Sequence, residues 1–172
     1  MPFNRVRLLL GLTSLGFGVL VYAFDRPADQ VYFLPDALHV PEQLQGSFGL
    51  LGQHLPTFLH VLAFCLLTAA FLPVKTRGAL VICSTWLLID AAFEAAQHAA
   101  IAPWAVRALP DWFARVPVLE NTAAYFRNGR FDPIDLLSIG LGALLGLLLI
   151  LVTRRFDPKV ASSKTSRSAP GP

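Results

Sequence analysis

The sequence is short of charge. Only 15% of its 172 residues are Asp, Glu, Lys or Arg, and 55% are hydrophobic, whereas a soluble domain has about 25% charged residues. This composition excludes a disordered chain and a typical soluble enzyme. The net charge is +3, but the basic residues flank apolar stretches and do not line one face. We therefore expect no nucleic-acid partner.

Cysteine is also scarce, and several familiar motifs are missing. The two cysteines, Cys65 and Cys83, form no C-x-x-C pair, which excludes a secreted disulfide scaffold. Both lie inside apolar stretches, where a thiol usually behaves as a small apolar side chain. We find no internal repeat and no glycine-rich nucleotide loop. One domain is therefore expected.

Long apolar stretches are what the sequence does have. A membrane-spanning helix needs about 20 predominantly apolar residues, and four stretches qualify: 6–24, 55–73, 78–102 and 134–153. The third carries Asp90 and Glu94, so a helix lying in the membrane interface is its alternative. The first follows Arg5, as the apolar part of a signal peptide would, but no small-x-small cleavage site follows Phe24. We therefore expect an uncleaved signal anchor. We predict an all-α membrane bundle of four transmembrane helices over residues 1–156.

The distribution of Lys and Arg predicts the orientation, because cytoplasmic segments are enriched in these residues. With the N-terminus inside, the inner segments hold Arg5, Arg7, Lys75, Arg77, Arg154, Arg155, Lys159, Lys164 and Arg167. The outer segments hold Arg26, Arg107, Arg115, Arg127 and Arg130. We therefore expect an N-in, C-in protein whose two long loops lie outside.

The segments outside the spans differ in character. Residues 103–132 mix aromatics with four arginines, which predicts short interfacial helices broken at Pro110 and Pro117. The segment would be an aromatic anchor belt or a cradle for a lipid headgroup or polyprenyl phosphate. Residues 157–172 are polar and are predicted to be a disordered cytoplasmic tail. The loop histidines His39 and His54 receive no role.

Polar side chains inside the apolar stretches are expected to converge near the outer surface. A charged side chain within a span raises the free energy of membrane insertion, so it is expected to face other protein groups or to serve a function. At a rise of about 1.5 Å per residue, Glu94 lies roughly 12 Å below the outer end of the third span, and His60 roughly 8 Å below the same surface. We predict one polar layer made of His60, Glu94, Gln97, His98, Arg130, Asp132 and Asp135.

Two interpretations of this layer stay open. Arg130 could neutralise Glu94 or Asp135 and tie the fourth span to the third. Alternatively, the layer forms a cavity that binds a polar ligand or performs acid/base chemistry, with His60 and Glu94 as catalytic candidates. Histidines in adjacent spans also suggest haem or a metal. Because no third ligand at metal-site spacing stands out, we assign no metal and no cofactor.

Small residues mark the expected contacts between helices. Ser138, Gly142 and Gly146 recur every four residues on the face of Asp135, and Ser14 and Gly18 do the same in the first span. Such small-xxx-small faces let membrane helices approach closely. The pattern predicts packing and turns Asp135 toward the inside of the bundle.

The order of the polar motifs resembles that of the VanZ-like family of small bacterial membrane proteins. The matching positions over residues 55–150 are His60 in an apolar helix, Glu94-x-x-Gln97, and Arg130 before a helix with Asp135, Gly142 and Gly146. Ile139 stands where the family pattern has Asn. The resemblance implies about four spans and a place in the cell envelope. The family's namesake is linked to low-level resistance to the glycopeptide teicoplanin, and no catalytic mechanism transfers.

The resemblance and the polar layer together suggest a function. We expect an inner-membrane protein that binds an envelope lipid, a glycopeptide-related ligand or a partner protein through a centre formed by Glu94 and Arg130. One alternative is an intramembrane enzyme acting on a lipid-linked substrate. Another is a small transporter or channel subunit that uses Asp90.

Overall fold

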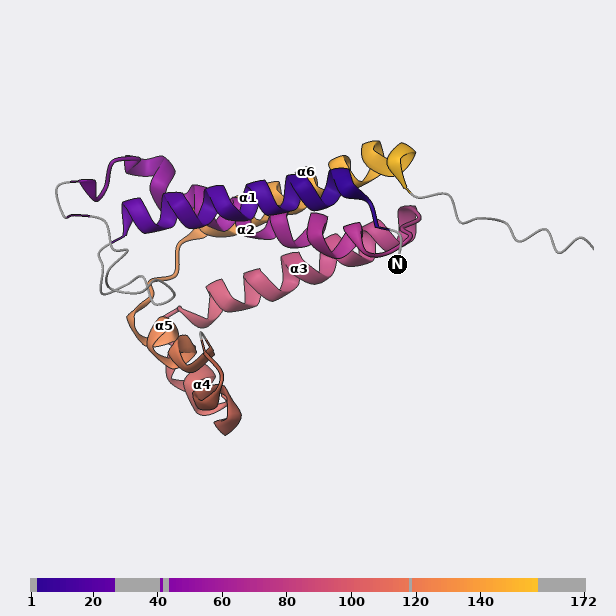
Figure 1. The fold of residues 1–172 in the computed structure, drawn as a ribbon. Helices are drawn as coiled ribbons and strands as arrows, with labels where there is room; N and C mark the ends of the chain where they lie inside the picture. Colours follow the sequence, from indigo (N-terminus) through magenta and orange to yellow (C-terminus); the bar gives the residue numbers. More distant parts are fainter. Residues whose placement is uncertain (1–2, 27–40, 42–43, 118, 158–172) are drawn as a thin grey trace, which may run out of the picture.

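The structure is a computed structural model that describes residues 3–26, 41, 44–117 and 119–157 (Figure 1). Over these residues it is all-helical and contains no strand. The four long helices are α1 Arg5–Asp25, α2 Gly49–Ala70, α3 Thr76–Ala96 and α6 Pro133–Val152. Each is long and apolar enough to cross a membrane, which confirms the predicted fold class and the four apolar spans.

Short helical elements connect α3 to α6 and extend α6. They are α4 Ala102–Arg107, η4 Asp111–Arg115, η5 Leu119–Asn121, α5 Thr122–Asn128 and η6 Thr153–Phe156. Pro110 precedes η4 as its N-cap, because proline starts a helix readily but cannot continue one. In Figure 1, α4 and α5 project sideways from the end of α3, away from the bundle of α1, α2 and α6.

α2 is the centre of the bundle, since it packs against α1, α3 and α6. Its fully buried side chains include Val61, Cys65 and Leu66, which meet Ile139 of α6 and Cys83 of α3 in one apolar core. Both cysteines are buried and free. Large apolar side chains on the outer faces of the helices, such as Leu9, Leu88, Leu137 and Leu144, are exposed. This surface suits contact with a lipid bilayer.

Hydrogen bonds between segments define the two ends of the bundle. At one end, which we call the termini end, the backbone N–H of Asn4 donates to Ala70 O (2.8 Å), and Asn4 Nδ2 donates to Thr153 O (3.1 Å). At the other, the loop end, Arg26 Nη2 donates to Gln53 O (3.4 Å). The helices therefore alternate in direction, and Asn4 and Thr153 share one end. Which end faces the cytoplasm stays a prediction.

Arg7 connects α1 to the ends of α2 and α6 at the termini end. Its side chain is fully buried. Nε donates to Thr153 Oγ1 (3.0 Å), while the two Nη groups donate to the carbonyls of Ala69 (3.0 Å) and Ile150 (3.1 Å). Nη1 also pairs with Asp157 Oδ1 at 2.9 Å. The sequence suggested only a topology signal for Arg7 and placed Asp157 in the disordered tail. The structure instead makes both part of one network. Residues 158–172, the rest of the predicted tail, lie outside the described residues.

Two helix boundaries differ from the prediction. α2 begins at Gly49, six residues before the predicted start, because Gly46 and Gly49 take positive φ angles of 72° and 54° that suit glycine. Pro56 lies inside this helix, as membrane helices tolerate. α3 ends at Ala96 rather than at residue 102. Pro103 cannot donate the helical hydrogen bond to residue 99 and lies in the first turn of α4 instead.

The small residues of α6 form a close contact with α2. A Cβ atom built on Gly142 would lie 2.5 Å from the carbonyl oxygen of Phe58, and one on Gly146 would lie 2.9 Å from Cys65 Cβ. A Cβ on Gly18 of α1 would lie 3.2 Å from Leu59 Cβ. The predicted small-residue contacts at these glycines are therefore present.

Gly142→Ala is expected to destabilise the bundle by about 1–3 kcal/mol, because the new methyl group overlaps the backbone of α2 and forces the helices apart. The matched control is Gly140→Ala on the same helix, where a Cβ meets no atom within 4 Å. The control should be neutral or stabilising, since alanine favours a helix by up to about 1 kcal/mol over glycine. Thermal midpoints of the two variants in one detergent test this, and equal midpoints would contradict the close contact.

Candidate functional site

Glu94 forms a buried junction at the loop end. Its side chain is only 5% exposed. Oε1 accepts a hydrogen bond from the backbone N–H of Asp132 (2.7 Å), and Oε2 accepts one from Gln97 Nε2 (2.9 Å). Asp132 itself caps α6, because its Oδ1 accepts from the backbone N–H of Ile134 (2.8 Å). Glu94 therefore connects the end of α3 to the beginning of α6.

Gln97 extends this junction to α5. It is the C-cap of α3 and is 8% exposed, and its Nε2 also donates to the hydroxyl oxygen of Tyr125 (2.9 Å). Burial raises the pKa of the Tyr125 phenol, so the phenol stays protonated at neutral pH. Gly129 is required beside this amide, because a Cβ there would overlap Gln97 Oε1. Sequence reasoning missed Tyr125, which the pattern suggested only as part of an aromatic belt.

His54 joins the loop end although it received no role from the sequence. Its Nδ1 lies 2.9 Å from Asp135 Oδ1, and both side chains are about one-sixth exposed. The early start of α2 explains this contact, because it carries His54 into the helix that faces α6. The ligand atoms of His54, Asp132 and Asp135 all lie within 4.8 Å of one another. The structure thus brings together three metal-ligand side chains that the sequence spacing did not reveal.

His60 lies deeper than the predicted layer. It follows the beginning of α2 by eleven residues, or about 16 Å along the axis. Its Nδ1 lies 2.8 Å from Asp90 Oδ2, and its side chain is 48% exposed. The predicted depth of His60 was therefore wrong, since it assumed a helix beginning at residue 55. A His–carboxylate pair suits a general base. The His60 ring also packs against the ring of Phe64, with centroids 4.5 Å apart.

Arg130 and His98 are exposed at the loop end. Arg130 forms no ion pair with any carboxylate in the described part of the chain, so the predicted pairing with Glu94 or Asp135 does not occur. His98 lies past the end of α3 and packs its ring on Phe131, with centroids 5.6 Å apart. The predicted stretch 78–102 placed His98 in the same helix as Glu94, but α3 ends at Ala96 and His98 lies outside it.

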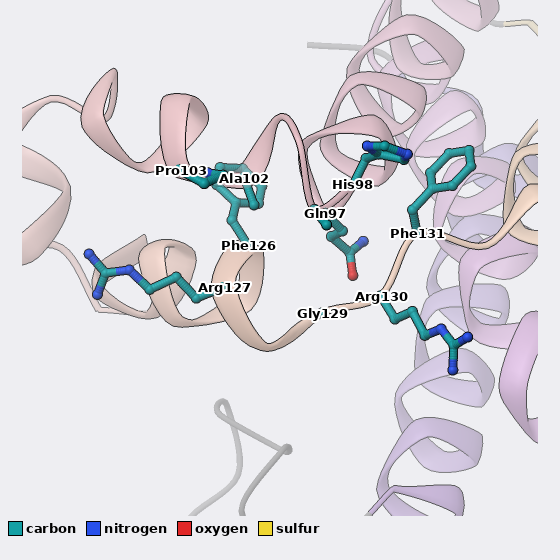
Figure 2. Close-up of a pocket in the computed structure, with 10 residues that line it drawn as sticks. Gln97, His98, Ala102, Pro103, Phe126, Arg127, Gly129, Arg130 and Phe131 are labelled. Atoms are coloured by element: carbon teal, nitrogen blue, oxygen red, sulfur yellow. The ribbon is translucent and has the colours of Figure 1, made fainter.

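An open cleft of about 600 Å³ lies between the end of α3, α4 and the segment from α5 to α6 (Figure 2). Its lining consists of Gln97, His98, Ala99, Ala102 and Pro103 on one side and Phe126, Arg127, Gly129, Arg130 and Phe131 on the other. Figure 2 shows the side chains of Arg127 and Arg130 extending to opposite sides of Gly129. Arg127, like Arg130, is exposed and has no ion-pair partner among the described residues.

The predicted polar layer therefore divides into three parts. The buried junction holds Glu94 and Gln97 with the backbone of Asp132, and Asp135 pairs with His54 beside it. His60 pairs with Asp90 farther along the bundle. Arg130 and His98 line the cleft. Comparison of this chain with protein-family models, curated proteins and solved structures finds no match.

Proposed function

We propose that this multi-pass membrane protein binds the phosphate group of an envelope lipid, such as a polyprenyl phosphate, in the cleft at the loop end. The observation that carries the proposal is the pair of arginines, Arg127 and Arg130, which line the cleft without an ion-pair partner among the described residues. Arginine is suited to phosphate because its planar guanidinium donates two parallel hydrogen bonds. Phe126 and Phe131 supply apolar surface for the first carbons of the lipid chain.

The position of the cleft supports a lipid ligand. It lies where α3 gives way to α4, and α4 and α5 extend sideways from the bundle (Figure 1). Trp104 and Trp112 on this projecting part are 67% and 55% exposed, and tryptophan favours the headgroup region of a membrane. A ligand in the cleft would then have its phosphate at headgroup level. The excess of Lys and Arg at the termini end supports a cytoplasmic position for that end and an outer position for the cleft.

Glu94 and Gln97 would act as supports for the cleft wall. Glu94 is buried, accepts hydrogen bonds from Gln97 and from the backbone of Asp132, and is not among the residues that line the cleft. Binding rather than catalysis is therefore the function that we propose. Two positions of the VanZ-like pattern, Gln97 and Arg130, line this cleft, and we propose on that resemblance that the chain is a VanZ-like protein of the bacterial inner membrane and cell envelope.

Binding of farnesyl phosphate, a short polyprenyl phosphate, to the full chain in nanodiscs of zwitterionic lipid tests the proposal. Arg127→Gln and Arg130→Gln are each expected to weaken binding roughly 10- to 100-fold, because a hydrogen bond to a charged group contributes about 1.5–3 kcal/mol. Arg115→Gln is the matched control, since this exposed arginine in η4 does not line the cleft. Its binding should equal that of the wild type.

Two further probes identify the part of the ligand that is recognised. Farnesol, which lacks phosphate, should bind at least tenfold more weakly, and inorganic phosphate should compete only at high concentration. If farnesol binds as tightly as farnesyl phosphate, the phosphate is not recognised and the proposed role of the arginines is wrong. Tight binding of inorganic phosphate alone would identify a free anion, rather than a lipid, as the ligand. An equal loss of affinity in Arg115→Gln would show that the effect comes from net charge, and it would contradict binding in the cleft.

A further inference from the structure

Three carboxylates lie near one another at the loop end. Glu94 accepts a hydrogen bond from the backbone of Asp132, and Asp135 lies in the first turn of the helix that Asp132 caps. The nearby cleft arginine, Arg130, is exposed and pairs with none of the described carboxylates. The imidazole of His54 is the group that contacts Asp135. Carboxylate oxygens and an imidazole nitrogen at one place are the donor types that bind a divalent cation.

The donor atoms lie close to the spacing of a metal site. His54 Nδ1 and one carboxylate oxygen from each of Asp132 and Asp135 lie within 4.8 Å of one another. Around a tetrahedral zinc ion with bonds of about 2.1 Å, ligand atoms lie roughly 3.4 Å apart. A bound ion would therefore draw the most distant of the three ligand atoms closer together and move His54 Nδ1 and Asp135 Oδ1, now 2.9 Å apart, slightly away from each other.

The three residues lie in or directly before helices. His54 lies within α2, Asp132 caps α6, and Asp135 lies in the first turn of α6. All three are partly buried, so an ion can reach them and still be shielded from bulk water. An acidic pair at the N-terminus of a helix alone would be explained by the helix dipole. The histidine from a different helix is the independent observation, because imidazole nitrogen selects transition metals over magnesium and calcium.

We propose that His54, Asp132 and Asp135 bind one divalent transition-metal ion of the zinc class, which links α2 to α6. Three protein ligands leave at least one coordination position open for water or another ligand. The site does not depend on the proposed lipid function, because Arg127 and Arg130 are not among its ligands. Failure of one proposal is therefore distinguishable from failure of the other.

Zinc binding to the untagged, EDTA-treated full chain in detergent at pH 7 tests this proposal. Calorimetric titration with zinc chloride is expected to give one ion per chain. His54→Gln and Asp135→Asn should each weaken binding at least tenfold. The matched control is His98→Gln, which removes a histidine from the same end of the molecule but not from the proposed site. It should bind zinc as the wild type does.

Thermal midpoints separate loss of the site from loss of the fold. Without metal, a cooperative transition in His54→Gln and Asp135→Asn shows that these variants are folded. Zinc should raise the midpoint of the wild type and of His98→Gln, since a ligand of the folded state stabilises it. It should not raise the midpoints of the two site variants. No uptake by the wild type, equal uptake by the site variants, or equal affinity for magnesium would each overturn the proposal.

Discussion

Replacing Arg7 by methionine is expected to lower the free energy of unfolding by about 3–5 kcal/mol, because it leaves buried hydrogen-bond acceptors without a donor at about 1–3 kcal/mol each. Arg7 is fully buried and binds Thr153, two carbonyls and Asp157. Methionine fills a similar volume but leaves the carbonyls of Ala69 and Ile150 without these donors. Denaturation in mixed micelles, followed by tryptophan fluorescence, measures the loss.

Arg5→Met is the matched control for this prediction. Arg5 occupies the same first turn of α1 but is exposed, so its replacement should change stability by no more than about 0.5 kcal/mol. Equal stabilities of Arg7→Met and Arg5→Met would show that the network at the termini end does not hold the bundle together.

Glu94→Gln is expected to lower the free energy of unfolding by about 1–3 kcal/mol, although glutamine has the shape of glutamate. Each carboxylate oxygen accepts a hydrogen bond, one from Gln97 and one from the backbone of Asp132. Glutamine has one acceptor oxygen and one NH₂ group. The NH₂ group would point at one of the two donors, Gln97 Nε2 or the backbone N–H of Asp132. The variant therefore leaves a buried donor unpaired, and that desolvation cost is about 1–3 kcal/mol. The thermal midpoint in one detergent should fall by several degrees.

Glu120→Gln is the control, because Glu120 is exposed in η5. Its midpoint should not move. An unchanged midpoint for Glu94→Gln would instead mean that the carboxylate contributes no stability, which points to binding or chemistry. That outcome would contradict the supporting role that we give to Glu94.

Predictions from local pattern agree with the structure where one helix alone decides the outcome. The apolar stretches predicted the long helices, because each stretch has to satisfy its own backbone hydrogen bonds in a membrane. The four-residue spacing of Gly142 and Gly146 predicted a contact face, because residues at this spacing lie on one side of a helix. Their partners on α2, Phe58 and Cys65, could not be read from the spacing.

Helix ends were predicted less well, and the errors carried into the site. The apolar stretch was predicted to begin at residue 55, whereas the turn at Gly46 and Gly49 begins α2 earlier. The six additional residues bring His54 to Asp135 and change the depth of His60. The end of α3 at Ala96 likewise leaves His98 outside the helix that carries Glu94. Both shifts depend on a turn or a proline whose effect competes with a continuous apolar pattern.

The sequence by itself determined the all-helical fold class, the four helices long and apolar enough to span a membrane, and the glycine faces by which helices pack. Only the tertiary structure decided which polar groups pair. Charge alone suggested Arg130 as the partner of Glu94, but a buried carboxylate needs hydrogen-bond donors at fixed positions. The structure supplies them from Gln97 and the backbone of Asp132. The same holds for Arg7, which donates to Thr153 Oγ1 and to the backbone carbonyls of Ala69 and Ile150. Because every residue has a backbone carbonyl, the sequence carries no signal for these partners.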